Sequence, residues 1–156
     1  MLQVRSFVPE DADVLGQLFY RAVQEGAAGA YSEAQRRAWC PNAPTGPAWT
    51  ERLSKADCVV AQQNGSVVGF MTLLDTGYLD LAYVDPAVAR RGIGTAMLAV
   101  LEGRGRAAGM TRMETEASLV AEGLFASAGW TVVKRQTIER GGVTLQNARM
   151  AKSLSD

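Results

Sequence analysis

The sequence predicts an α/β fold of the α+β kind, in which a mixed sheet of about seven strands is flanked by helices. Segments with the composition of strands alternate with amphipathic helical segments along all 156 residues. Asn64-Gly65, the strongest short-range signal for a β-hairpin, joins two of the strand segments. The helix predicted from Ile93 connects two further strands, and such a crossover makes them parallel.

Local signals place the boundaries of the early elements. Residues 3–8 alternate, as a half-buried strand does. Pro9 suits the first position of the following helix, because its φ is fixed near the helical value. Ser32 is expected to cap the second helix, with Gln35 as its capping-box partner.

Proline and glycine mark the later boundaries. Pro86 follows the strand over 78–84 and ends it, since proline cannot donate to a strand ladder. Gly129 is expected to end the last helix, and Gly141-Gly142 to turn between the last two strands. The expected order is strand 3–8, helix 9–25, helix 32–39, helix 48–55, strands 58–62, 67–74 and 78–84, helix 93–107, strand 110–115, helix 118–128, and strands 130–140 and 143–151.

Composition excludes several classes of function. Sixteen basic and sixteen acidic residues cancel, which indicates neither a nucleic-acid nor a membrane surface. No apolar run approaches the roughly 20 residues of a membrane span. Residues 1–5 lack the basic region and apolar core of a signal peptide, so a cytoplasmic protein is expected.

The chain contains no histidine, which excludes every His-based mechanism. Cys40 and Cys58 lack metal-ligand spacing, so no metal is expected.

Residues 90–95, Arg-Arg-Gly-Ile-Gly-Thr, connect the strand over 78–84 to the central helix. Gly92 and Gly94 leave the backbone uncovered at the helix start, where free N–H groups and the helix dipole attract anions. A tight turn is the plain alternative. The P-loop pattern is absent, and a dinucleotide fingerprint would need glycine or alanine where Met97 stands.

Together with Val84-Asp85-Pro86, this stretch resembles the GNAT superfamily of N-acetyltransferases. Members have a strand ending in Val-x-Pro, then Gln/Arg-x-x-Gly-x-Gly/Ala at a helix start; Ala89 departs from that first position. The resemblance covers the whole chain. It implies one acetyltransferase domain over 1–156, which transfers an acetyl group from acetyl-CoA directly to a primary amine of a small molecule, amino acid or peptide N-terminus. Homodimers are common in such folds, although no stretch of this sequence predicts one.

The resemblance also implies which residues bind the two substrates. The N–H of Val84 matches the oxyanion donor of the family, at the point where strands four and five splay. Ser118 matches an asparagine that contacts CoA, and it is equally well explained as a helix N-cap. Tyr31, Trp39 and Tyr78 would line the acceptor pocket, although Tyr31 and Trp39 also suit packing. The implied CoA-binding residues are Ala82, Tyr83, Val84, Arg90, Arg91, Gly92, Ile93, Gly94, Thr95 and Ser118.

Carboxylates are the candidates for the general base. Alternation puts Tyr78, Asp80, Ala82 and Val84 on one strand face, and Asp80 is the carboxylate among them. Burying the Asp80 carboxylate without a partner would cost free energy, so this side chain should be solvated, paired or functional. Glu116 is the second candidate.

A tyrosine is the usual general acid of the family, but its position here is Phe125, which cannot donate a proton. Tyr83 or Tyr31 takes that role, or the thiolate leaves with the help of water. The competing interpretation is an acyl-CoA-binding sensor or partner module without turnover.

Overall fold

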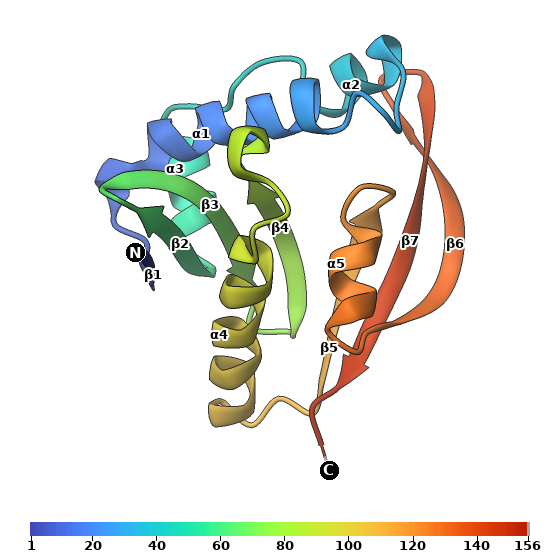
Figure 1. Cartoon of the computed structure of the whole chain (residues 1–156). Helices are drawn as coiled ribbons and strands as arrows, with labels where there is room; N and C mark the ends of the chain where they lie inside the picture. The colour runs from blue at the N-terminus through green and yellow to red at the C-terminus, as the bar shows by residue number, and fades with distance from the viewer. Residues whose placement is uncertain (156) are drawn as a thin grey trace.

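The computed structural model describes residues 1–155 and shows one seven-stranded sheet with the strand order β1-β2-β3-β4-β5-β7-β6 (Figure 1). The strands are β1 (Leu2–Ser6), β2 (Asp57–Gln63), β3 (Ser66–Leu73), β4 (Tyr78–Val84), β5 (Arg112–Ser118), β6 (Thr131–Arg140) and β7 (Val143–Ser153). The helices are α1 (Ala12–Arg21), α2 (Glu33–Trp39), α3 (Pro47–Ser54), α4 (Ile93–Ala107) and α5 (Glu122–Ser127), with short turns η1 (Pro9–Asp11), η2 (Ala22–Gly26) and η3 (Pro86–Val88). The predicted fold class is confirmed.

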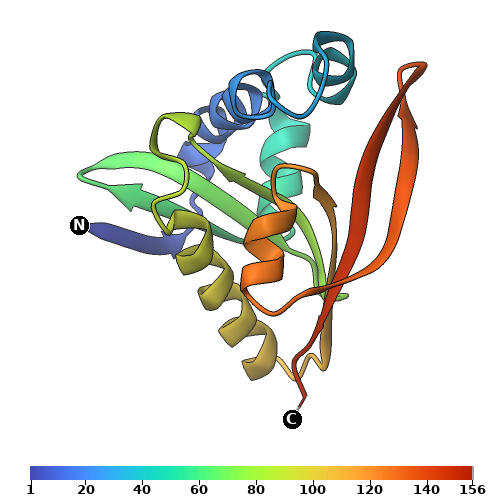
Figure 2. The ribbon, with the colours of Figure 1, turned by 45° about the vertical axis from the view of Figure 1, so that its right-hand side comes forward.

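Helices cover both faces of the sheet (Figure 2). On one face α4 and α5 pack over a core that includes Leu79, Met97 and Phe125. On the other, α1 and α3 pack over a second core that includes Leu15 and Phe70. None of the helices within residues 1–155 combines the length and apolar character that a membrane span requires.

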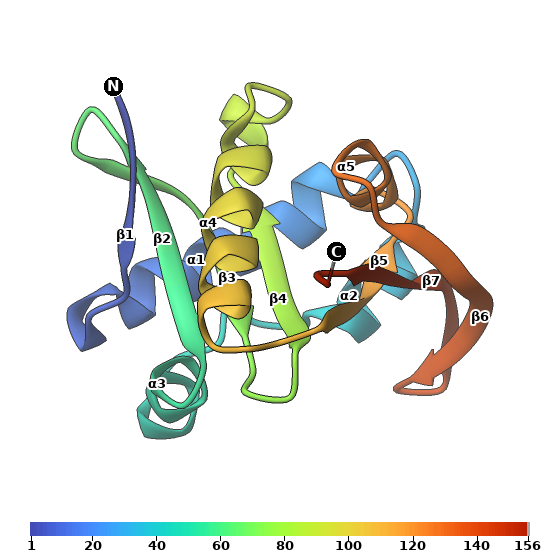
Figure 3. The same ribbon diagram turned by 90° about the horizontal axis from the view of Figure 1, so that it is seen from below.

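Strands β4 and β5 are parallel neighbours for only a short distance. Their pairing consists of Tyr78 with Glu114 and Leu79 with Thr115. The Thr115 hydroxyl donates to the Leu79 carbonyl at 2.8 Å, at the last paired position. Beyond it the two strands diverge, as seen from below in Figure 3. The predicted splay of strands four and five is therefore confirmed.

A β-bulge at Asp80 changes which side chains of β4 share a face. The register between β3 and β4 shifts there, so Asp80 is an extra residue on its strand. Leu81 and Tyr83 consequently pack toward α1, while Ala82 and Val84 pack toward α4. The expectation that Asp80, Ala82 and Val84 share one face is wrong, because simple alternation does not allow for a bulge.

Several boundaries near the end of the chain differ from those expected. Strand β5 continues to Ser118, where a strand ending at residue 115 was predicted, because antiparallel pairing with β7 extends to that residue. Helix α5 is correspondingly short, and Val120, expected on its buried face, is 52% exposed.

The capping box predicted at the start of α2 is confirmed. Ser32 Oγ accepts a hydrogen bond from Gln35 N–H at 3.2 Å, and Gln35 Oε1 accepts one from Ser32 N–H at 2.8 Å.

The β6–β7 hairpin rises beside α5 and meets the segment around α2 (Figure 1). The Tyr31 hydroxyl donates to the Gln146 carbonyl at 2.6 Å, and Gln35 Nε2 donates to the Thr144 carbonyl at 3.0 Å. These contacts join segments more than 100 residues apart in the chain. They hold the hairpin over the gap between β4 and β5.

Asp11 ties the first strand to α1, and its replacement by asparagine should destabilise the protein in a pH-dependent way. Its two carboxylate oxygens each lie 2.9 Å from the Arg5 guanidinium, and one accepts from Val8 N–H at 3.0 Å. The hydrogen bonds from Arg5 lower the pKa of Asp11 below its ordinary 3.8. Its stabilising effect is therefore complete above that value and is lost as pH falls through the lower folded pKa.

For Asp11→Asn we expect a loss of about 1–3 kcal/mol at pH 7, measured by urea unfolding, and a smaller loss at acid pH, below the ordinary pKa of 3.8. Glu10→Gln, on the same turn but exposed and without a cationic partner among residues 1–155, is the matched control. An equal loss at both pH values for Asp11→Asn would show that the charge of Asp11 does not contribute.

Candidate functional site

Two residues in the left-handed conformation shape the loop between β4 and α4. Arg90 has φ of 64° and Gly92 has φ of 81°. At the start of the loop, Asp85 forms an ion pair with Arg21 of α1 at 3.0 Å and accepts a hydrogen bond from Ala87 N–H at 3.0 Å. The loop is therefore anchored to α1 just before α4 begins.

Helix α4 begins at Ile93 with Gly92 as its N-cap, and no side chain caps it. Its first N–H groups lack intrahelical partners and stand at the positive end of the helix dipole. Arg90 and Arg91 are exposed beside them, and neither forms an ion pair with a residue from 1 to 155. Thr95 is also exposed, whereas the buried Ile93 side chain leaves only its N–H available. The helix start is thus an open cationic site.

The two glycines of this loop differ in their surroundings. A Cβ atom at Gly92 would meet nothing within 4 Å, so the site above it is open. A Cβ atom at Gly94 would lie 2.8 Å from Cδ2 of Leu124 in α5. Gly94 therefore allows α4 and α5 to pack closely, a role that local sequence does not reveal.

Strand β4 has an unpaired edge where β5 diverges. Asp85 N–H donates to the Val68 carbonyl of β3 at 2.8 Å, and alternate residues of an antiparallel ladder bond to the same neighbour. Ala82 and Val84 therefore direct their N–H groups the other way, into the gap toward β5. An extended ligand could use these donors as an added strand would.

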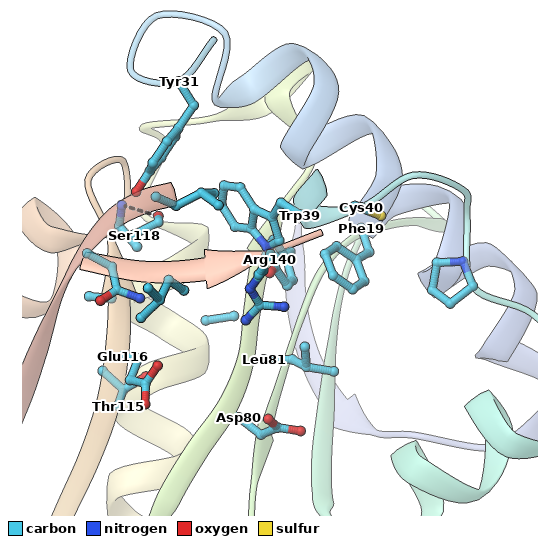
Figure 4. A pocket seen from close by; sticks show the side chains of 18 of the residues that line it. Phe19, Tyr31, Trp39, Cys40, Asp80, Leu81, Thr115, Glu116, Ser118 and Arg140 are labelled. Atoms are coloured by element: carbon cyan, nitrogen blue, oxygen red, sulfur yellow. Dashed lines mark hydrogen bonds between the residues drawn. The ribbon is translucent and has the colours of Figure 1, made fainter. Parts of the chain in front are cut away.

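A cavity of about 330 Å³ opens at this gap and extends beneath α1 and the segment around α2 (Figure 4). Its walls come from α1, the turn after α2, β4, β5 and the β6–β7 hairpin. Of the residues predicted for the site, those that line it are Tyr31, Trp39, Tyr78, Asp80, Ala82, Tyr83, Glu116 and Ser118. The open helix start and this cavity thus lie on either side of one gap in the sheet.

Four charged side chains line the cavity, and two of them neutralise each other. Arg52 of α3 donates a hydrogen bond from Nε to Asp80 Oδ2 at 3.1 Å, and its Nη2 forms an ion pair with the same oxygen at 3.0 Å. Glu116 and Arg140 line different walls, on β5 and β6. Neither has an ion-pair partner within residues 1–155.

Comparison with known proteins agrees with this arrangement. The acetyltransferase (GNAT) domain family matches residues 27–154, which is most of the chain. The chain belongs to the GNAT superfamily. The N-acetyltransferase YafP of Escherichia coli K12, itself uncharacterised, is 32% identical over 149 residues, covering 96% of this chain and 94% of YafP. The protein is therefore an N-acetyltransferase.

Solved GNAT structures share the whole fold. A GCN5-related N-acetyltransferase from Rhodopseudomonas palustris superposes with a TM-score of 0.91 at 32% identity, covering 97% of this chain and 94% of that one. YncA of Salmonella typhimurium superposes with a TM-score of 0.75 at 22% identity, covering 100% and 95% of the two chains. The latter comparison shows the GNAT fold alone.

The aromatic residues of this GNAT cavity differ in how free their polar atoms are. The Tyr31 hydroxyl is engaged, since it donates to Gln146 O and accepts from Leu119 N–H at 2.9 Å. Its ring meets that of Trp39 edge-on at 5.4 Å. Burial raises the pKa of Tyr31, so it stays protonated. Tyr31 thus connects the segment around α2 to β7, and it also lines the cavity.

Tyr83 and Tyr78 face the cavity from β4. The Tyr83 ring stacks on Phe19 at 4.3 Å and, although half-exposed, is closely surrounded by other rings. This burial raises the pKa of Tyr83, and hydrogen bonding with the Trp39 side chain acts in the opposite direction. Burial also raises the pKa of Tyr78, with smaller contributions from the charges of Glu116 and Asp80. Both phenols therefore keep their protons at neutral pH.

Three further residues bear on the chemistry. Phe125, where many GNAT members have tyrosine, is buried against Trp130 at 4.9 Å between ring centres and has no proton to give. Burial raises the pKa of Cys40 to about 11, so this cavity residue is a neutral thiol rather than a nucleophile. The Ser118 hydroxyl accepts from Ala121 N–H at 3.1 Å and turns the chain into α5.

Sequence reasoning missed the contribution of distant segments. No local signal marks Arg52 as the partner of Asp80, or Arg140 and Asn147 as cavity residues, because polar residues on helices and strands usually face solvent. Within residues 1–155 no group of three or more acidic or cysteine side chains is placed to hold a metal ion.

Proposed function

We propose that this protein transfers the acetyl group of acetyl-CoA directly to the primary amine of a small molecule. The observation that carries the proposal is the gap between β4 and β5, which has an open cationic helix start on one side and a polar cavity on the other. Two ligands can meet there from opposite faces of the sheet.

In this proposal CoA binds on the side of α4. Its pyrophosphate lies on the free N–H groups at Gly92 to Thr95, beside Arg90 and Arg91. Its pantetheine arm lies along the unpaired edge of β4 at Ala82, Tyr83 and Val84. Two related folds support this choice, since YncA of Salmonella typhimurium and a phosphinothricin acetyltransferase of Sinorhizobium meliloti were both solved with acetyl-CoA.

We assign the base to Glu116. The Asp80 carboxylate is already engaged by Arg52, through one hydrogen bond from Nε and an ion pair with Nη2, whereas Glu116 forms no ion pair among the described residues. Glu116 takes a proton from the ammonium, directly or through water. The freed amine then attacks the thioester carbonyl, and the oxyanion is held by Val84 N–H.

The intermediate then collapses by breaking the C–S bond, and the nitrogen, which becomes the amide, loses its second proton to water. The leaving thiolate takes a proton from Tyr83 or from water, because Phe125 has none to donate. No covalent enzyme intermediate forms, in keeping with the neutral thiol of Cys40.

The test is release of CoA thiol from acetyl-CoA in the presence of a panel of primary amines, at several pH values. We expect amine-dependent thiol release that rises with pH as the ammonium deprotonates. Calorimetric binding of CoA without thiol release from any amine would instead indicate an acyl-CoA sensor.

A further inference from the structure

Two exposed side chains of opposite charge line the cavity without an ion-pair partner within residues 1–155. Arg52 and Asp80 neutralise each other, which leaves the Glu116 carboxylate on β5 and the Arg140 guanidinium on β6. Neither pairs with the other or with a charged group elsewhere in residues 1–155. A ligand that carries one positive and one negative group would satisfy both.

The strand register puts these two groups on one face of the sheet. Ser118 of β5 is opposite Asn147 of β7, and Asn147 is opposite Gln136 of β6. Opposite residues share a face, and so do residues two apart on a strand. Glu116 and Arg140 therefore both project from the face that is turned toward α2, as Figure 4 shows.

Arg140 is held over the cavity by the turn that follows it. A Cβ atom on Gly141 would lie 3.9 Å from Ala38 of α2, so the hairpin tip lies close to that helix. The hydrogen bonds from Tyr31 and Gln35 fix the rest of the hairpin against the same segment. The charge of Arg140 also reaches the hydroxyls on β4, where it opposes the rise that burial causes in the pKa of Tyr78 and Tyr83.

Asn147 supplies an independent sign of a missing ligand. Its Oδ1 atom is buried in the cavity wall and has no hydrogen-bond partner among the described residues. A buried acceptor without a donor is costly, and such groups in native structures are usually satisfied by a ligand or water. An ammonium carries three donors, enough for Asn147 Oδ1 and for the Glu116 carboxylate.

We propose that the acceptor is a free amino acid, with its ammonium at Glu116 and Asn147 Oδ1 and its carboxylate on the Arg140 guanidinium. This inference rests on the proposed function for the identity of the second substrate. The remaining walls, which include Phe19, Trp39 and Leu145, suit an apolar side chain. The cavity is at the small end of ligand sites, which typically measure about 300–1,000 Å³, as a free amino acid requires.

The proposal excludes acceptors in which the carboxylate is absent or blocked. A peptide N-terminus or a plain alkylamine offers the ammonium alone and would leave Arg140 without its partner. An amino acid and its α-carboxamide differ only in that charge, so the pair isolates the contribution of Arg140.

The experiment measures binding of glycine, L-leucine, L-methionine and L-phenylalanine, each against its α-carboxamide, to the protein saturated with CoA. Calorimetry near pH 6.5 keeps both amines charged, since the amine of the α-carboxamide resembles a peptide N-terminus, with a pKa of about 7.7–8.0, and the carboxylate raises the amine pKa of the free amino acid further. We expect at least one amino acid to bind about 10- to 100-fold more tightly than its amide, as for a charge-assisted hydrogen bond. Arg140→Gln should remove this preference without changing CoA affinity.

Lys134→Gln is the matched control, because it removes a positive charge from the same strand outside the cavity and should keep the preference. The proposal would be overturned if each amino acid and its amide bound equally well, or if no member of the panel bound. It would also be overturned if the preference for the acid survived Arg140→Gln, or if that variant changed the affinity for CoA. Carboxylate-selective binding without thiol release would instead leave this site in place and contradict the proposed enzymatic function.

Discussion

Glu116→Gln is expected to lower turnover by about 10²–10⁴-fold at neutral pH, the usual contribution of a general base. Glutamine keeps the size and hydrogen bonding of glutamate but cannot accept the proton. The loss should shrink at high pH, where the amine deprotonates without help. Affinity for CoA, which binds on the other side of the gap in our proposal, should not change. Steady-state thiol release from pH 6 to 10 and CoA calorimetry measure the two quantities.

Two variants make this test specific. Glu114→Gln removes a carboxylate two residues earlier on β5, where it pairs with Arg112 and Arg149 outside the cavity, and should keep normal turnover. Asp80→Asn frees Arg52 in the cavity, and we expect a change in turnover that does not recover at high pH. If turnover recovered at high pH in Asp80→Asn but not in Glu116→Gln, the base would be Asp80.

Gly92→Asp is expected to lower CoA affinity on the order of 100-fold. A Cβ atom there meets nothing within 4 Å, so the new carboxylate would stand in the open space where we place the pyrophosphate. At about 4 Å two unit charges interact by about 1 kcal/mol in water and about 4 kcal/mol near a protein surface, and 1.4 kcal/mol is tenfold. Calorimetric titration with CoA gives the affinity directly.

Gly92→Asn is the control, because asparagine has the same shape and tolerates the left-handed φ of 81° but carries no charge. It should lose much less affinity than the aspartate variant. Gly94→Asp is not a clean test, since its Cβ atom would collide with Leu124. Unchanged affinity in Gly92→Asp, with circular dichroism like that of the parent, would place the pyrophosphate elsewhere.

The sequence alone determined the parts of this protein that depend on neighbouring residues. Ser32 and Gln35 form their capping box because both partners lie within one helical turn. The Asn64-Gly65 turn needs left-handed φ at both positions, and both have it. The parallel arrangement of β4 and β5 follows from the single helix that connects them.

Packing between distant segments of the chain sets which residues meet across the gap. The bulge at Asp80 depends on pairing with β3, and it reversed the expected direction of Ala82 and Val84. The partner of Asp80 is Arg52, 28 residues earlier, so no spacing rule could pair them. Arg140 reaches the cavity because its hairpin docks on α2. Contacts between distant segments depend on how the folded layers pack, and short-range spacing along the chain does not record that packing.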